Sequence, residues 1–174
     1  RAFSNTTGLY GGGEYTDENR RKVVAEALDI DEKILPTKPT LPYNVIIDKI
    51  NSGEIKALWI VATNPIVSWI NNLDFKKAAE KLEFLVVQDI YSDTDTARYC
   101  DLFLPSTNGL KKEGVIINTE RRLSKLDPVL PKMENELSDY DIALGIGEAL
   151  GMGKLLDKWR TPEIAFNTIK QCTK

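Results

Sequence analysis

Four short, mostly apolar runs are the feature that most constrains the fold of this chain. They are Ala57–Ala62, Phe84–Val87, Asp101–Leu104 and Gly114–Asn118. These runs lack the alternation of a half-exposed strand, and they are typical of strands covered on both faces, as in a parallel sheet. We therefore expect them to form the buried strands of one sheet.

Stretches with helical periodicity flank these runs. They are Pro42–Lys49, Leu73–Leu82, Ser138–Leu150 and Thr161–Lys170. Gly151 follows the third stretch as a helix stop, and Thr161 with Pro162 supplies a cap and a first-turn proline for the last. The alternation predicts an α/β fold, a doubly wound Rossmann-like domain with a mostly parallel sheet and helices on both faces.

The length of 174 residues suits one domain, which we expect to be a fragment of a larger protein because Arg1 suggests a mid-chain cut. The expected parts are a loop-rich lead-in (1–41), a Rossmann-like core (42–150) and a C-terminal helix (151–174). Within the lead-in, Thr6–Gly13 predicts a backbone-exposing loop. The stretch Arg121–Leu137 has two prolines and no clear period, so we expect a surface connection.

Composition excludes several classes of function. The net charge of −3 does not favour nucleic acid or an anionic membrane, and no apolar run reaches the roughly 18 residues of a membrane span. The two cysteines, Cys100 and Cys172, have no CxxC spacing, and the chain has no histidine. We therefore expect no metal site, no iron–sulfur site and none of the usual catalytic groups in this chain.

Polar side chains follow the first three strands at the ends where this fold binds ligands. Asn64 follows the first run, Gln88 with Asp89 follows the second, and Ser106 with Thr107 follows the third. Asn64 can donate and accept hydrogen bonds, while the Asp89 carboxylate can accept from two adjacent donors, such as those on guanine or ribose. These residues predict a nucleotide ligand.

Simpler interpretations remain open for the same residues. Asn64 can be a turn residue before proline, and Asp89 can be a helix N-cap. Lys112 lies in a charged cluster that is either a solvated rim or a source of a cation for phosphate. No GxGxxG or P-loop motif is present, so neither fingerprint supports the nucleotide.

Six motifs in a fixed order resemble the molybdopterin oxidoreductase superfamily, which includes nitrate reductases, formate dehydrogenases and dimethyl sulfoxide reductase. They are Ile55–Pro65, Phe84–Tyr91, Thr94–Pro105, Lys112–Gly114, Asn118–Arg122 and Ser138–Tyr140. Upstream, Tyr15–Arg21, Leu28–Ile30 and Ile34–Pro36 look most like nitrate reductase catalytic subunits.

The resemblance implies a metal, molybdenum or sometimes tungsten, held between two molybdopterin guanine dinucleotides (bis-MGD). Matched by motif, Asn64 would contact one dinucleotide, and Gln88 with Asp89 would hold its guanosine end. Lys112 and Asp139 would be further contacts. Taken alone, Asp139 is a first-turn helix residue favoured by the helix dipole.

The resemblance further implies a nitrate reductase that converts nitrate to nitrite, of which this chain supplies a cofactor-binding domain that is inactive alone. A formate dehydrogenase and a non-catalytic scaffold that has lost the cofactor are the alternatives. Implied partners are the remaining domains of the same subunit with their 4Fe–4S cluster, an electron-donor protein and a small oxyanion substrate at the metal. The lack of a disulfide-like cysteine arrangement slightly favours a cytoplasmic over a periplasmic enzyme.

Overall fold

The computed structural model describes residues 8–69, 72–120 and 122–173. Thr6, Thr7 and Arg121, which belong to expected loops, lie outside these residues. The chain divides into two compact units. One is Pro42–Ile142, and the other combines Arg1–Leu41 with Ala143–Lys174. The expected single domain stays a prediction.

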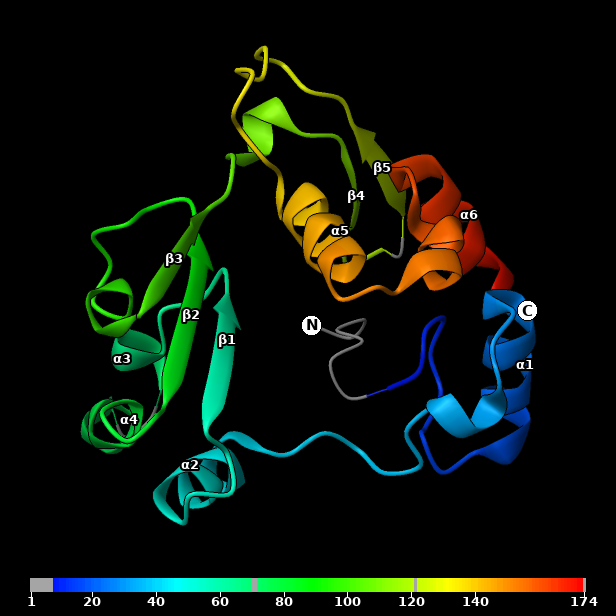
Figure 1. The fold of residues 1–174 in the computed structure, drawn as a ribbon. Coiled ribbons are helices and arrows are strands. Elements are labelled where there is room, and N and C mark those ends of the chain that lie inside the picture. Colours follow the sequence, from blue (N-terminus) through cyan, green and yellow to red (C-terminus); the bar gives the residue numbers. More distant parts are fainter. Residues whose placement is uncertain (1–7, 70–71, 121, 174) are drawn as a thin grey trace. The chain divides into compact units, whose positions relative to one another are not determined.

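A three-stranded parallel sheet forms the centre of the Pro42–Ile142 unit, as expected from the apolar runs (Figure 1). Its strands are β1 (Ala57–Val61), β2 (Phe84–Asp89) and β3 (Leu102–Pro105), in the order β1-β2-β3. Because all three strands are parallel, their carboxyl ends lie at one edge of the sheet, where Gln88 pairs in register with Leu104.

Helices α2 (Tyr43–Asn51), α3 (Pro65–Ser68) and α4 (Asn72–Ala79) cover one face of this sheet (Figure 1). The core beneath them consists of Ile47, Ile50, Ile60, Phe75, Ala78, Ala79, Leu85, Val87 and Ala97. Alternation along β2 places Gln88 on the opposite face from Leu85 and Val87.

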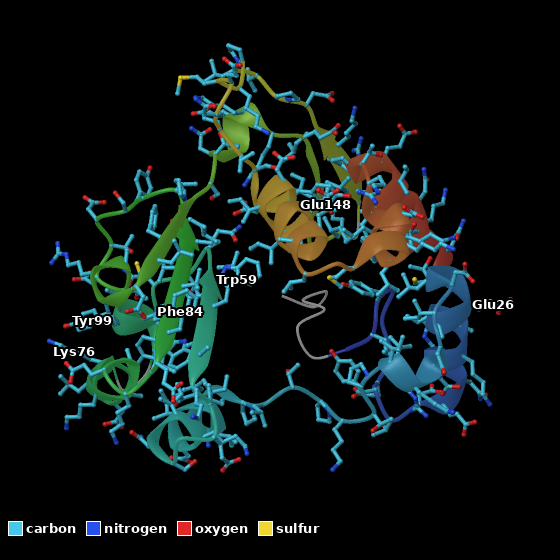
Figure 2. The ribbon with its side chains drawn as sticks, viewed as in Figure 1. Glu26, Trp59, Lys76, Phe84, Tyr99 and Glu148 are labelled. Carbon is cyan, nitrogen blue, oxygen red and sulfur yellow. The ribbon has the colours of Figure 1, made fainter. Side chains whose placement is uncertain are left out.

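The other face of the sheet meets the start of α5 (Asp139–Ala149), because Asp139 hydrogen-bonds to Gln88. Elsewhere on that face, Trp59 and Phe84 are 42% and 44% exposed (Figure 2). On the helix-covered side of the sheet, the ammonium group of Lys76 in α4 lies 5.5 Å from the centre of the Tyr99 ring.

The fourth apolar run is a strand, but the expectation that it joins the parallel sheet is wrong. β4 (Gly114–Ile117) pairs antiparallel with β5 (Leu123–Leu126) in a separate two-stranded sheet. The turn between them is held by Asn118, whose side-chain oxygen accepts from the backbone N–H groups of Glu120 and Arg122. A short turn permits only antiparallel pairing, since a parallel pair needs a long crossover.

The expectation that Arg121–Leu137 is a surface connection is also corrected, because this stretch contains the strand β5. All residues of these two strands except Gly114 are exposed, with Val115 at 43% and Ile116 at 51%. Apolar content therefore predicted the strand correctly but not its environment.

The second unit contains α1 (Glu18–Leu28) and α6 (Pro162–Gln171), which contact each other. Helix α1 lies within the expected loop-rich lead-in and begins at Asp17, whose carboxylate accepts from the backbone of Asn19 and Arg20. Short 3₁₀ helices occur in the two units at Glu32–Ile34, Ala97–Tyr99, Gly109–Lys111 and Gly153–Trp159.

Arg20 connects three parts of this unit through backbone carbonyl groups. Its guanidinium donates to Gly12 O at 3.1 Å, Tyr10 O at 3.2 Å and Cys172 O at 2.6 Å. Gly11 has φ +76°, and a Cβ there would lie 2.4 Å from Cys172 O. The glycine loop is therefore packed tightly against the end of α6.

The predicted helix ends in this unit are confirmed. Gly151 has φ +73° and follows the end of α5. The Thr161 side chain accepts from Ile164 N, with Pro162 as the first residue of α6. None of the helices in the described residues is both long enough and apolar enough to span a membrane.

Candidate functional site

The ends of β1 and β2 lie side by side at the carboxyl edge of the sheet. Ala62 N donates to Gln88 O at 2.9 Å, so Asn64 follows β1 close to the end of β2. Ala62 has φ +52°, a left-handed conformation that costs a residue with a Cβ about 1–2 kcal/mol. A strained turn of this kind is typical of functional sites, and it lies between β1 and Asn64.

The Asn64 side chain is oriented by Thr96. Its Oδ1 accepts from Thr96 N at 3.2 Å and from Thr96 Oγ1 at 2.6 Å. Asn64 precedes α3 but makes no side-chain cap hydrogen bond there, so the turn-residue interpretation explains its backbone only. With Oδ1 occupied, the group that Asn64 can offer to a ligand is its amide NH₂, a donor.

Thr96 is a residue of this site that sequence reasoning missed. It is fully buried, and its hydroxyl also accepts from Ile66 N at 3.2 Å in the first turn of α3. Thr96 lies within the recognised motif Thr94–Pro105, yet a threonine in a loop gives no sign of burial. Only the folded structure reveals that it joins the two loops.

Gln88, Lys112 and Asp139 form one cluster, although they are far apart in sequence. Gln88 Nε2 donates to Asp139 Oδ1 at 2.9 Å, and Lys112 Nζ donates to Asp139 Oδ2. Asp139 is the first residue of α5, and Lys112 follows the 3₁₀ helix Gly109–Lys111. Three of the five predicted site residues are thus in direct contact.

The Asp139 carboxylate is held in its ionised form. Burial acts to raise the pKa of Asp139, but hydrogen bonds from Lys112, Gln88 and Ser106 and the Lys112 charge outweigh burial. The net pKa lies below its ordinary value of 3.8. Lys112 is therefore paired with Asp139, and its side chain remains 31% exposed.

Two buried side-chain oxygens have no hydrogen-bond partner among the described residues, namely Gln88 Oε1 in this cluster and Thr107 Oγ1 in the loop after β3. Gln88 is only 1% exposed. A buried acceptor without a donor costs about 1–3 kcal/mol, so native proteins rarely leave one unless a ligand or water supplies the partner. Thr107, like Ser106, follows β3 and was not among the predicted site residues.

Asp89 ends β2 and organises the loop that follows. Its Oδ1 accepts from Ile90 N at 2.7 Å and Tyr91 N at 3.4 Å. No helix begins there, so the interpretation of Asp89 as a helix N-cap is wrong. Asp89 O also accepts from Ser106 N at 3.0 Å, which links the β2 end to the loop after β3.

Lys111 does not join the cluster of Lys112. Its Nζ donates to both carboxylate oxygens of Glu136, at 2.6 and 2.9 Å. The hydrogen bond from Lys111 lowers the pKa of Glu136, as does the Met133 backbone N–H. Lys111 therefore forms a partly buried ion pair with Glu136 rather than lying free in solvent.

The side chains that meet at this edge of the sheet are hydrogen-bonding and charged groups. Burial raises the pKa of both Cys100 and Cys172, so neither thiol is activated as a thiolate. Within the described ranges, no group of three or more histidine, cysteine or acidic side chains could hold a metal ion. The edge of the sheet instead offers an amide donor, a cation and several acceptors, a set that suits a polar, phosphate-bearing ligand.

Known proteins with similar sequences are longer enzymes. The chain is 31% identical to the assimilatory nitrate reductase catalytic subunit of Bacillus subtilis (strain 168), over 95% of this chain and 23% of that protein. It is 38% identical to a nitrate reductase of Synechocystis, over 82% of this chain and 20% of the relative. It is 37% identical to an F420-dependent formate dehydrogenase subunit alpha of Methanocaldococcus jannaschii, over 70% of this chain and 18% of the relative.

The fold also matches a solved structure. Acetylene hydratase from Pelobacter acetylenicus superposes with a TM-score of 0.63 at 14% identity, over 92% of this chain and 23% of that chain. The chain thus spans about a quarter or less of the proteins it resembles. The molybdopterin oxidoreductase family matches residues 5–149, most of the sequence, and the chain belongs to this family.

Proposed function

We propose that this chain holds the guanosine end of one molybdopterin guanine dinucleotide within a longer molybdenum enzyme that reduces nitrate to nitrite. The observation that carries the proposal is the convergence of Gln88, Lys112 and Asp139 at the sheet edge that also bears Asn64. The relatives named as nitrate reductases support the choice of substrate.

The residues present fit such a ligand. Gln88 Oε1 is a buried acceptor that requires a donor, and a guanine ring supplies one. The Asn64 NH₂ and the Lys112 ammonium suit the diphosphate, while the Asp89 carboxylate accepts from the base or ribose. Asp139 holds Gln88 and Lys112 in place. The bound cofactor would supply the redox chemistry at its metal, and this chain would contribute position and charge.

A formate dehydrogenase is the second candidate, and the relative from Methanocaldococcus jannaschii favours it. The same five residues would bind the dinucleotide in either enzyme, because they contact the nucleotide rather than the substrate. A scaffold that has lost the cofactor would have no need for an unsatisfied buried acceptor at Gln88, so the structure favours the binding role.

The test uses the longer protein that contains this chain, produced with molybdenum cofactor. We expect nitrate to oxidise a reduced viologen dye, and we expect Asp89→Ala to lower the guanine nucleotide retained after gel filtration by about tenfold, the loss of one charged hydrogen-bonding group. Asp93→Ala is the matched control, since Asp93 is an exposed carboxylate in the same loop. Turnover with formate alone would replace the nitrate assignment, and full nucleotide retention by the Asp89 variant would contradict the binding role.

A further inference from the structure

A small cavity lies between α2 and α4, on the side of the sheet that these helices cover. Its volume is about 180 Å³, and its described lining residues are Tyr43, Asn44, Ile47, Asp48, Trp69 and Asp74. None of the five candidate site residues is among them, and the contact of Gln88 with Asp139 lies on the other face of the sheet. The cavity is therefore separate from the candidate nucleotide site.

Two aromatic side chains line the cavity and contact each other. The ring centroids of Tyr43 and Trp69 are 5.4 Å apart, with 56° between their planes. Trp69 also packs edge-on against Phe75 at 4.8 Å, and Phe75 is fully buried, so the core holds the indole in place. Tyr43 is 39% exposed. The face of an aromatic ring attracts cations within about 6 Å, and indole attracts them most strongly.

Two carboxylates add negative charge to this aromatic lining. Asp74 lies in the first turn of α4, where the helix dipole favours an acidic residue. Asp48 lies in the last turn of α2, where the dipole disfavours one, and no lysine or arginine of the described residues pairs with it. The adjacent Lys49 pairs with Glu54 instead. A cation bound in the cavity would compensate the charge of Asp48.

The size and chemistry of the cavity favour a guanidinium group. Sites for whole small molecules typically measure about 300–1,000 Å³, so a cavity of about 180 Å³ suits the end of a single side chain. A guanidinium is planar, stacks on aromatic rings and donates several N–H groups to carboxylates, whereas a lysine ammonium is compact and more strongly hydrated. Arginine and aromatic residues are also enriched where proteins bind one another.

We propose that this cavity is a docking site for an arginine side chain of a partner protein. The guanidinium would lie against the aromatic rings and donate to the carboxylates of Asp48 and Asp74. Charge complementarity supports such a partner, since the described lining holds two acidic side chains and no basic one. The inference goes beyond the proposed function and does not depend on it, because no lining residue belongs to the nucleotide site.

The experiment uses the longer protein that contains this chain, labelled with 5-fluorotryptophan and observed by fluorine NMR. The Trp69 signal is identified by its absence in a Trp69→Phe variant, and the signals of Trp59 and Trp159 serve as internal references. The probe is a capped Gly-Arg-Gly tripeptide. We expect the Trp69 signal alone to shift, with half-saturation at about 1–10 mM, the affinity of a single side chain.

Two related tripeptides and two variants test the chemistry of binding. Lysine in place of the central arginine should raise the half-saturating concentration by about threefold or more, and neutral citrulline should cause no shift. Asp48→Asn should weaken binding of the arginine peptide by about threefold, as expected for an exposed ion pair. Glu80→Gln loses the same charge and should have no effect, because Glu80 is an exposed residue directly after α4 that does not line the cavity.

Three results would overturn the inference. Equal shifts with arginine and citrulline would show that charge is not recognised, and unchanged affinity in the Asp48→Asn variant would remove the carboxylate from the site. Absence of a Trp69 shift in the folded longer protein would show that the cavity is closed there or filled by the enzyme's own chain. Each of these results leaves the proposed nucleotide binding intact.

Discussion

Replacing Thr96 with valine should destabilise the Pro42–Ile142 unit by about 2 kcal/mol. Valine has the shape of threonine but no hydroxyl, so the 2.6 Å bond to Asn64 is lost, worth about 1 kcal/mol. Ile66 N loses its acceptor as well, at a cost of about 1–3 kcal/mol for a group that is partly buried. The extra buried methyl group offsets up to about 1 kcal/mol of this.

The assay is urea unfolding followed by tryptophan fluorescence in a Trp159→Phe background, so that Trp59 and Trp69 report on this unit alone. Thr96→Ser is the matched control, since it keeps both hydrogen bonds and loses one buried methyl group, at about 1 kcal/mol. A double-mutant cycle with Asn64→Ala isolates the bond itself, and we expect a coupling energy of about 1–2 kcal/mol. Additive effects of the two substitutions would refute the reasoning, because they would show that Thr96 does not stabilise the fold through Asn64.

Three further outcomes follow from the geometry. Ala62→Gly should stabilise the protein by about 0.5 kcal/mol in urea unfolding, because relief of the left-handed φ, about 1–2 kcal/mol, exceeds the entropy cost of glycine, about 0.4–1 kcal/mol. A loss of stability would show that Ala62 is not strained. Arg20→Lys should speed amide hydrogen exchange in α1 and at the end of α6 by about tenfold, since one ammonium cannot reach three carbonyls; unchanged exchange would exclude Arg20 as the connector. The depressed pKa of Asp139 contributes stability that is present above its ordinary value of 3.8 and is lost as the pH falls through the lower folded pKa. Lys112→Met raises that folded pKa, so it should shift acid unfolding to higher pH, as measured by circular dichroism across a pH series. An identical acid midpoint would contradict the pairing of Lys112 with Asp139.

The parallel sheet could be predicted because its signal is local. Each apolar run has the length of a strand, and the helical stretch Leu73–Leu82 between the first two runs supplies a crossover of the kind that parallel pairing requires. The antiparallel pairing of the fourth run could not be predicted in this way, because it depends on the hydrogen bonds by which Asn118 closes a tight turn. Helix α1 was missed because its pattern is weakly amphipathic, with most of its side chains polar.

The residues of the candidate site could likewise be predicted only in part from the sequence. Asn64 and Asp89 could be selected from sequence because the carboxyl end of a parallel strand is a general binding position. Ser106 occupies the same kind of strand-end position, but Thr96 could not be selected, since it lies in a loop whose path is decided by tertiary packing. The contact between Gln88 and Asp139 joins residues 51 positions apart, a pairing that no local pattern contains.

The exposed hairpin of β4 and β5 has a practical consequence for work with the isolated chain. Its two strands present Val115, Ile116, Ile117 and Leu123 to solvent, and within the described residues this sheet has only these two strands. A small sheet with exposed apolar side chains is a template for pairing between molecules, so self-association of the isolated chain should increase with its concentration through this element first. A lysine at Ile116, at the centre of β4, would oppose that association while leaving every residue of the nucleotide site unchanged.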